Sequence, residues 1–451
     1  MRFASSSQID AALSAQHGAR FSLKNTDNGN RAIGSMVFIP LLFYAFFCQS
    51  LASSSVVLYA CLAVSFVSFV MHFLANGRFA NKKFGLEIAW VPFFILFYVH
   101  SFVFGVNNLT LLVVYTILFV CMYAASGEKE WISTCIKVLV AFAAFHAMCT
   151  IAFWLFPALY APVKAAFFSS SYMASDYRSG FTAHYSTNSI YLSFGLVCWA
   201  CGLIGEKSKP RAKDIILGVV LLLSLFLTTK RGPLVASVVA VSICYLFVNR
   251  DKFTGTALKA LIIVMLAILA VGVLATFVPG VEATLQRFVE LSEDETGNGR
   301  SELYDCAWSM FYSNPLFGSG WGSYSKYVAT TSLGAMYNNL GFTSMSTHNV
   351  YLQLLAETGI VGLALFLVPA AVTLIAAMRR SAAHRGGGLY GESFCLWACV
   401  GAQIFFLVYC FSGNPLYDPQ CYIPYFMSCV GVFAICGIDT KRKDGAIHGN
   451  L

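Results

Sequence analysis

Long apolar segments recur along most of the chain, and short polar stretches separate them. An α-helix needs about 20 predominantly apolar residues to cross a hydrocarbon core of about 30 Å. The segments come close to this length, so we interpret them as about twelve transmembrane helices. They span residues 32–48, 55–75, 86–105, 109–126, 134–156, 189–205, 215–229, 234–248, 260–278, 359–378, 393–412 and 423–438.

The composition favours a membrane protein over a soluble one. Hydrophobic residues make up 58% of the 451 positions and charged residues only 11%, whereas soluble domains carry about 25% charged residues. We therefore predict an all-α, polytopic integral membrane protein with a single membrane domain at 32–438. A cytoplasmic segment at 1–31 precedes this domain, and a cytoplasmic tail at 439–451 follows it.

The distribution of basic residues predicts the orientation. The net charge is +8, but Lys and Arg lie in short clusters between apolar segments and form no continuous basic stripe, so we expect no nucleic-acid partner. Alternate loops and both termini together hold 21 Lys and Arg, and the opposite loops hold seven. Because basic loops stay in the cytoplasm, both termini are predicted to be cytoplasmic.

Two of the loops on the outer side are long, 157–188 and 279–347, and both are rich in Tyr, Ser, Gly and Asn. Such loops favour chemistry with polar ligands outside the membrane. Within the longer loop, helical spacing places four side chains on one face: Arg300, Tyr304, Trp308 and Phe311. This face suits a helix at the membrane interface, and it suits packing on the helix bundle equally well.

The turn at 230–233, with the sequence Lys-Arg-Gly-Pro, joins two short segments, 215–229 and 234–248. Each is about 22 Å long as a helix, so the turn is expected to dip below the outer surface. Pro233 suits a first helical position, and a helix N-terminus beside Lys230 and Arg231 would bind an anion. The alternative is an interfacial anchor whose cations reach lipid head groups.

His348 ends the longer loop and leads into an apolar helix, with Ser346 or Thr347 available as its N-cap. An imidazole at the outer surface exchanges protons near neutral pH. Tyr351 shares the helix face of His348, whereas Glu357 points the opposite way and is not expected to contact it directly. A structural role for His348 remains the alternative.

A run of hydrogen-bonding residues at 176–188 ends the first long loop and includes Arg178, His184 and Tyr185. It is a candidate surface for sugar or phosphate contacts. Polar loops are usually only solvated, which is the alternative interpretation.

Five segments, taken in order, resemble the O-antigen polymerase and O-antigen ligase superfamily, which includes capsular polysaccharide polymerases. They are 178–188, 230–233, the Gly299–Arg300 pair with Trp308, 314–322 (NPLFGSGWG), and 348–352 (HNVYL) continuing to 357–359 (ETG). The resemblance covers about residues 170–365. It implies a fold similar to the GT-C class of lipid-dependent glycosyltransferases, with a large extracytoplasmic loop over the site.

The resemblance also implies the reaction. The enzyme would be a metal-independent, inverting glycosyltransferase of the bacterial cytoplasmic membrane, without a cofactor, that joins polyprenyl-diphosphate-linked repeat units into capsular or O-antigen polysaccharide. His348, Arg231 and Arg300 would be catalytic. The residues expected to bind substrate are Arg178, His184, Tyr185, Lys230 and Tyr351. Fixed guanidinium groups stabilise a departing diphosphate without a metal, and we find no D-x-D motif in an outer loop.

Two other functions stay open at this point. A ligase would transfer the glycan to a terminal acceptor instead of another repeat unit, and the sequence does not distinguish it from a polymerase. A flippase or transporter would also suit twelve helices, although it should place polar residues near the membrane midplane. The expected partners are the lipid-linked donor and acceptor, membrane lipids, and a chain-length regulator or flippase.

Overall fold

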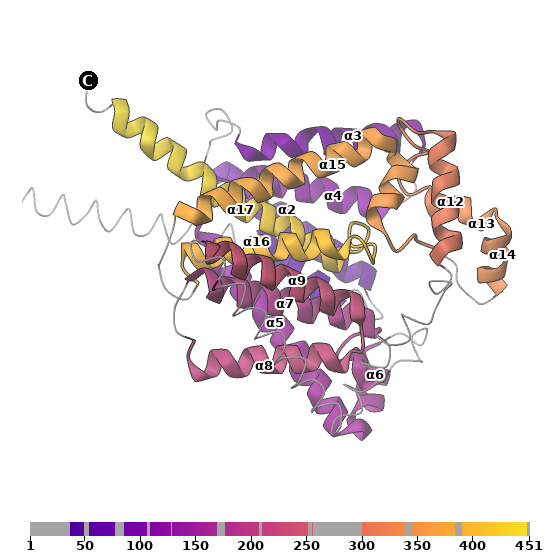
Figure 1. Cartoon of the computed structure of the whole chain (residues 1–451), viewed down its shortest axis with the longest axis horizontal. Coiled ribbons are helices and arrows are strands. Elements are labelled where there is room, and N and C mark those ends of the chain that lie inside the picture. The colour runs from indigo at the N-terminus through magenta and orange to yellow at the C-terminus, as the bar shows by residue number, and fades with distance from the viewer. Residues whose placement is uncertain are drawn as a thin grey trace, which may run out of the picture.

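The computed structural model describes residues 37–48, 54–76, 85–105, 109–127, 129–168, 176–206, 210–250, 255, 300–339, 345–383 and 390–448. Helices dominate these ranges, which contain no β-sheet, so the predicted all-α class is confirmed (Figure 1). The predicted span 260–278 lies outside the described residues. Each of the other predicted spans coincides wholly or partly with a helix.

The described residues form fourteen numbered α-helices. Their bounds are α2 (Ser54–Asn76), α3 (Val91–Val103), α4 (Leu109–Ala125), α5 (Glu130–Leu155), α6 (Tyr160–Phe167), α7 (Tyr185–Glu206), α8 (Ala212–Leu227), α9 (Arg231–Val248), α12 (Arg300–Ser313), α13 (Tyr324–Ala329), α14 (Ser332–Asn339), α15 (Val350–Ala383), α16 (Glu392–Tyr409) and α17 (Pro419–His448). A π-helical turn, η1 (Tyr44–Cys48), and a 3₁₀ turn, η2 (Leu86–Trp90), precede α2 and α3.

Seven of the described helical segments are long and apolar enough to cross a bilayer. One is formed by η2 and α3 together, and the other six are α5, α7, α9, α15, α16 and α17. The helices near 37–47, 55–71 and 109–123 are apolar but shorter. The chain is therefore a multi-pass membrane protein, and the number of about twelve spans stays a prediction.

The centre of the bundle is formed by α7, α16 and α17. The apolar windows of these helices are 78%, 83% and 89% buried, whereas those of η2 with α3, α5, α9 and α15 are only 33–39% buried. The outer helices expose large apolar side chains such as Phe102 and Val56. Such a surface is unfavourable in water and expected in lipid.

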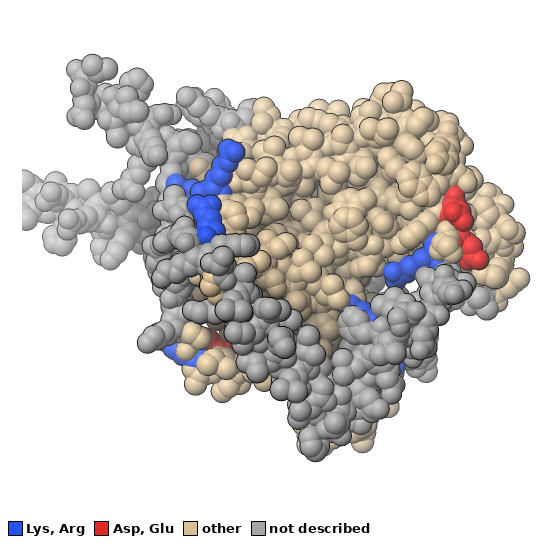
Figure 2. Space-filling model, viewed as in Figure 1, with Lys and Arg blue, Asp and Glu red and all other residues tan. Residues whose placement is uncertain are grey.

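The two ends of the bundle differ in the segments they gather. At one end, Glu392 contacts Lys129 at 2.6 Å and Arg380 at 3.9 Å. At the other, the Val350 N–H donates to the Cys410 carbonyl at 2.9 Å. The loops predicted to be external thus meet at one end. Figure 2 shows basic side chains toward the ends and an uncharged surface between them.

The long helix α15 is broken at Gly359, whose backbone (φ 66°, ψ −169°) is not helical. The segment 314–320 lies against this break. The N–H groups of Ile360 and Val361 donate to the carbonyls of Pro315 and Leu316, at 2.9 and 3.2 Å. In the reverse direction, the carbonyls of Ala356 and Glu357 accept from the N–H groups of Ser319 and Gly320, at 3.3 and 2.9 Å. Because the helix is broken at Gly359, these N–H and C=O groups lack partners within α15, and the bonds to 314–320 supply them.

Contact between the two segments is close enough to require glycine on both sides. A Cβ atom on Gly318 would lie 2.3 Å from the Glu357 backbone, and one on Gly359 would lie 2.3 Å from the Leu316 backbone. Next to the segment, Trp321 is 5% exposed and packs edge-on against Phe93 and Phe97. The second part of the motif, 318–321, is therefore packed against the helix bundle.

Helix α12 runs across the end of the bundle (Figure 1) and packs on α15. Its buried side chains are Leu303, Ala307 and Met310, which lie beside Leu352 and Ala356 of α15. Of the two alternatives for the face with Trp308, packing on the bundle does not fit this residue, which is 41% exposed. The buried face of α12 is the one with Leu303, Ala307 and Met310, and the interfacial alternative stays a prediction.

The hydrogen bonds between α15 and 314–320 predict a large stability difference between two glycine substitutions. Gly359→Ala places a Cβ in a glycine-only conformation that costs about 1–3 kcal/mol, and the clash with Leu316 adds to it. Gly105 also has a positive φ, of 80°, but no atom lies within 4 Å of the place that a Cβ would occupy there. Thermal unfolding in detergent should show a clearly larger loss for Gly359→Ala than for Gly105→Ala, and equal losses would contradict this explanation.

Candidate functional site

Two cations lie near the aromatic ring of Tyr185, at the end of the bundle that holds the loops predicted to be external. Tyr185 is the first residue of α7, and the Nζ atom of Lys230, in the turn before α9, lies 4.4 Å from its ring centre. The Cζ atom of Arg178 lies 5.2 Å from the same centre. A ring face attracts cations through its quadrupole. The first long loop and the 230–233 turn are therefore neighbours.

His184 stacks on Tyr185 with 4.2 Å between ring centres. The surrounding protein disfavours the charged imidazole, and Lys230 and Arg178 repel it further, so that the pKa of His184 falls to about 4. His184 is therefore neutral at pH 7 and offers a hydrogen-bonding group. Arg178 donates from Nε to both carboxylate oxygens of Asp176 at 2.8 Å, so part of its guanidinium is already committed.

The turn that carries Arg178 is fixed to the bundle by a buried amide. The Asn188 side chain donates to the Arg178 carbonyl and to the Thr150 hydroxyl of α5, both at 2.9 Å. Gly180 adopts a positive φ of 52°, and a Cβ there would lie 2.6 Å from the Thr150 hydroxyl. Arg178 is thus held on a rigid turn despite its place in a loop.

His348 occupies a tight turn immediately before α15. Its φ is 54°, in the left-handed region that residues with a Cβ rarely adopt. The N-cap of α15 is Asn349, whose side-chain oxygen accepts from the Leu352 N–H at 3.2 Å. The predicted N-cap at Ser346 or Thr347 was therefore wrong. The Thr347 hydroxyl instead donates to the Asn349 carbonyl at 2.7 Å, which closes the turn around His348.

Arg300 and Lys230 both influence the charge on His348. The imidazole is exposed, yet the protein around it disfavours the charged form, and the positive charges of Arg300 and Lys230 lower the pKa of His348 further below its usual value. Lys230 thus belongs to the surroundings of both His184 and His348. The structure brings Arg178, His184, Tyr185, Lys230, Arg300 and His348 to one end of the bundle.

Arg231 is the first residue of α9 and is half-buried. The helix begins two residues earlier than predicted, so Pro233 is the third helical residue and not the first. Proline is still tolerated there, because the first N–H groups of a helix have no partner within it. The Gly232 backbone lies close to Ser412 and Tyr409, next to the connection between α16 and α17. Arg231 therefore emerges beside the residues that follow α16.

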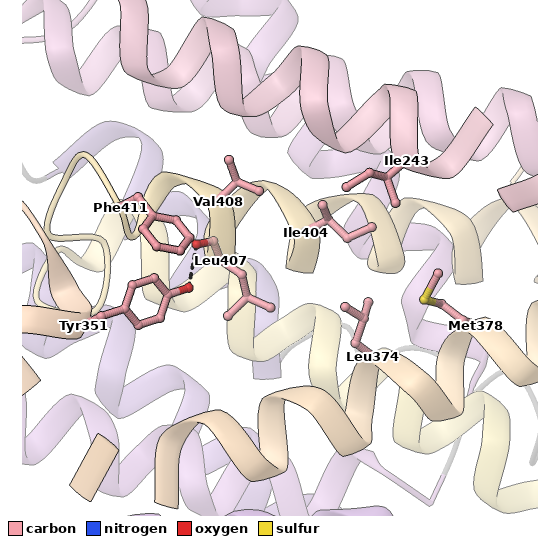
Figure 3. A pocket seen from close by; sticks show the side chains of 8 residues that line it. All are labelled: Ile243, Tyr351, Leu374, Met378, Ile404, Leu407, Val408 and Phe411. Atoms are coloured by element: carbon pink, nitrogen blue, oxygen red, sulfur yellow. Dashed lines mark hydrogen bonds between the residues drawn. The ribbon is translucent and has the colours of Figure 1, made fainter. Parts of the chain in front are cut away.

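An apolar cavity of about 250 Å³ lies between α9, α15 and α16 (Figure 3). Tyr351 and Phe411 form one end of it and Met378 the other, with Ile243 and Leu374 between them. The Tyr351 hydroxyl donates to the Leu407 carbonyl at 2.7 Å and so joins α15 to α16, while its predicted role in substrate binding stays a prediction. Because Tyr351 is three residues from His348, the cavity begins beside the candidate site.

Four residues near the site were not predicted from the sequence. Gln353, Asn414 and Tyr417 form a hydrogen-bonded group around the buried Glu357. Asp418 precedes α17, and burial raises its pKa to about 7. The only sequence signal for Asn414, Tyr417 and Asp418 was position, since 414–418 falls in a predicted outer loop, and Gln353 had no such signal. No group of three or more His, Cys, Asp or Glu side chains within the described ranges is arranged to hold a metal ion.

The effect of Arg300 on His348 is testable without any activity assay. Diethyl pyrocarbonate modifies neutral imidazole, so the rate of His348 modification, followed by peptide mass spectrometry, should reach half its maximum at a pH below 6.5. Arg300→Gln removes a repelling cation, so this midpoint should rise. Arg379→Gln, near the far end of α15, is the control. An unchanged midpoint in Arg300→Gln would separate Arg300 from the site.

Comparison with known families supports the resemblance seen in the sequence. Residues 216–367 match the family model described as O-antigen ligase. No curated protein sequence matches the chain significantly. The matched range includes Lys230, Arg231, Arg300 and His348, together with the broken helix at Gly359. Residues 216–367 are therefore similar to an O-antigen ligase domain, which supports the resemblance of the chain to the O-antigen ligase and polymerase superfamily.

Proposed function

We propose that this protein is a glycosyltransferase that polymerises polyprenyl-diphosphate-linked repeat units at the outer face of the bacterial cytoplasmic membrane. The observation that carries the proposal is the grouping of Lys230, Arg300 and His348 at one end of the bundle, inside the range similar to an O-antigen ligase domain. A lipid diphosphate needs cations beside an apolar channel, and both features occur together here.

The donor would bind in two parts. Its diphosphate would lie among Lys230, Arg231 and Arg300, because guanidinium groups bind phosphate oxygens in pairs and hold the charge that develops on departure. Its polyprenyl chain would enter the apolar cavity between α9, α15 and α16, whose outer end lies beside Tyr351. In this arrangement the anomeric carbon would lie near His348.

The transfer step would then be a direct displacement. The acceptor hydroxyl oxygen attacks the anomeric carbon, the bond to the diphosphate oxygen breaks, and its electron pair leaves with the polyprenyl diphosphate. A neutral imidazole accepts the hydroxyl proton, and the lowered pKa of His348 keeps it neutral at pH 7. Displacement from the opposite face inverts the anomeric centre, and the cations supply the charge neutralisation that a metal supplies elsewhere.

Two alternatives use parts of the same site. A ligase would perform the same displacement with a terminal glycolipid or wall polymer as acceptor. A flippase would move the lipid-linked donor without breaking a bond, and it would place the cations along a path across the membrane. Gathering of the candidate side chains at one end of the bundle favours an enzyme.

The role of His348 can be tested with purified protein and lipid-linked donor. General-base help is worth about 10² to 10⁴ in rate, so His348→Ala should lower turnover by that amount while donor binding is retained. If His348 only orients the hydroxyl, His348→Gln should keep far more activity than His348→Ala. Full turnover by His348→Ala would remove His348 from the mechanism.

The cavity makes a separate prediction about the lipid chain. Ile243→Trp should fill the cavity from α9, since Ile243 lines it and is 38% exposed. If only two methylene groups of the polyprenyl chain can no longer be buried in the cavity, donor binding weakens by about 1.6 kcal/mol. The KM for a long-chain donor should therefore rise about tenfold or more. A donor analogue with a short chain should be affected less.

The matched control is Ile375→Trp, because Ile375 is 48% exposed on α15 but is not among the residues that line the cavity. It should leave the KM of both donors near the wild-type value. An equal response of long and short donors to Ile243→Trp would place the polyprenyl chain elsewhere.

A further inference from the structure

The side chain of Glu357 is fully buried and receives four hydrogen bonds. Its Oε1 atom accepts from the Tyr324 N–H at 3.1 Å and from the Gln353 amide at 3.2 Å. Its Oε2 atom accepts from the Gly322 N–H at 2.8 Å and from the Tyr417 hydroxyl at 2.6 Å. Four donors match the four acceptor positions of a carboxylate. The site is thus built for a group that only accepts.

This carboxylate determines which way the Gln353 amide points. Because Glu357 only accepts, the NH₂ group of Gln353 faces it, and the Gln353 oxygen faces the other way. That oxygen accepts from the Asn414 amide at 2.6 Å and, more weakly, from the Thr347 N–H at 3.4 Å. Thr347 is 0% exposed, so its N–H depends on a protein partner.

Thr347 connects this network to His348. The Thr347 hydroxyl accepts from the Asn349 N–H at 3.1 Å and donates to the Asn349 carbonyl, so it spans His348 on both sides. His348 has a positive φ of 54°, a conformation that persists only where its surroundings hold it. A chain of contacts therefore runs from Glu357 through Gln353 and Thr347 to the His348 turn.

We propose that Glu357 and Gln353 are positioning residues that hold the His348 imidazole in place for transfer. The inference rests on the proposed function, in which His348 accepts the proton of the acceptor hydroxyl. Glu357 also ties the segment around Gly322 to α15, so that the long outer loop and the His348 turn share one anchor. A displacement of about 1 Å at a reacting group lowers turnover by up to about 10²-fold.

The main variant is Glu357→Gln, which keeps the shape of the side chain. Its amide NH₂ would face at least one donor that needs an acceptor, and the Gln353 amide would lose its fixed direction. Turnover with lipid-linked donor should fall about 10- to 100-fold, while the KM for the donor stays within about threefold of wild type. Gln353→Met, which leaves Glu357 in place, should likewise lower turnover and leave the KM for the donor nearly unchanged.

Thr373→Val is the matched control, because it removes a buried hydrogen bond of the same helix, from the Trp90 indole to the Thr373 hydroxyl, and leaves Glu357 and Gln353 untouched. Its turnover should stay close to wild type. In the double variant Glu357→Gln with Gln353→Met, the loss should not exceed that of the more severe single variant, since both act through one path. Losses that multiply, or full activity of Glu357→Gln, would overturn the inference.

The position of His348 has a readout that needs no transfer. The pH dependence of His348 modification by diethyl pyrocarbonate should change in Glu357→Gln and Gln353→Met, and it should not change in Thr373→Val. If the wild-type protein transfers no glycan at all, the proposed function fails, and this readout still decides the coupling. Unchanged His348 modification in both variants would overturn the coupling even if transfer is observed. Should Glu357→Gln fail to fold, Gln353→Met carries the test.

Discussion

A helix that breaks inside a membrane leaves backbone N–H and C=O groups without partners, and lipid cannot supply any. In this protein the break at Gly359 is satisfied by the segment 314–320, which returns four hydrogen bonds to the two halves of α15. The remaining architecture of the site depends on these bonds. They join part of the long loop predicted to be external to α15 around its break, and His348 lies just before the first residue of this helix.

The four backbone bonds and the Glu357 carboxylate act on the same two segments. The bonds join 314–320 to the break, and Glu357, two residues before it, binds the backbone at Gly322 and Tyr324. Trp321 lies between these contacts and packs among aromatic residues of α3. The segment 314–324 is thereby held against α15, the helix that His348 precedes. Such rigidity suits a reaction that depends on the placement of charge.

Much of this organisation could be predicted from the sequence, because it follows from local patterns. Hydrophobic segment length predicted the helices, and the order of short motifs predicted a common site for Arg231, Arg300 and His348, which stays a prediction. Helix bounds were less accurate: α15 begins at Val350, two or three residues after the start expected from an N-cap at Ser346 or Thr347, and α9 begins at Arg231, two residues before the expected start.

The interactions that sequence patterns could not predict are those between distant segments. Helical periodicity predicted that Glu357 does not contact His348 directly. It could not reveal that Gln353 links the two residues through Thr347. It also could not identify the packed face of α12, because that choice depends on the shape of α15. The Asp176 pairing of Arg178 is local, and its significance appears only beside Tyr185 and Lys230.

The proposed function requires that a bond of the lipid-linked donor is broken at this site. The most direct test is to reconstitute the purified protein in vesicles with a polyprenyl-diphosphate-linked oligosaccharide and to measure released polyprenyl diphosphate and glycan length together. We expect one polyprenyl diphosphate to be released for each repeat unit added, with inversion at the anomeric carbon. Donor that crosses the membrane with its glycosyl–diphosphate bond intact, and with no growth of the glycan, would contradict the proposal.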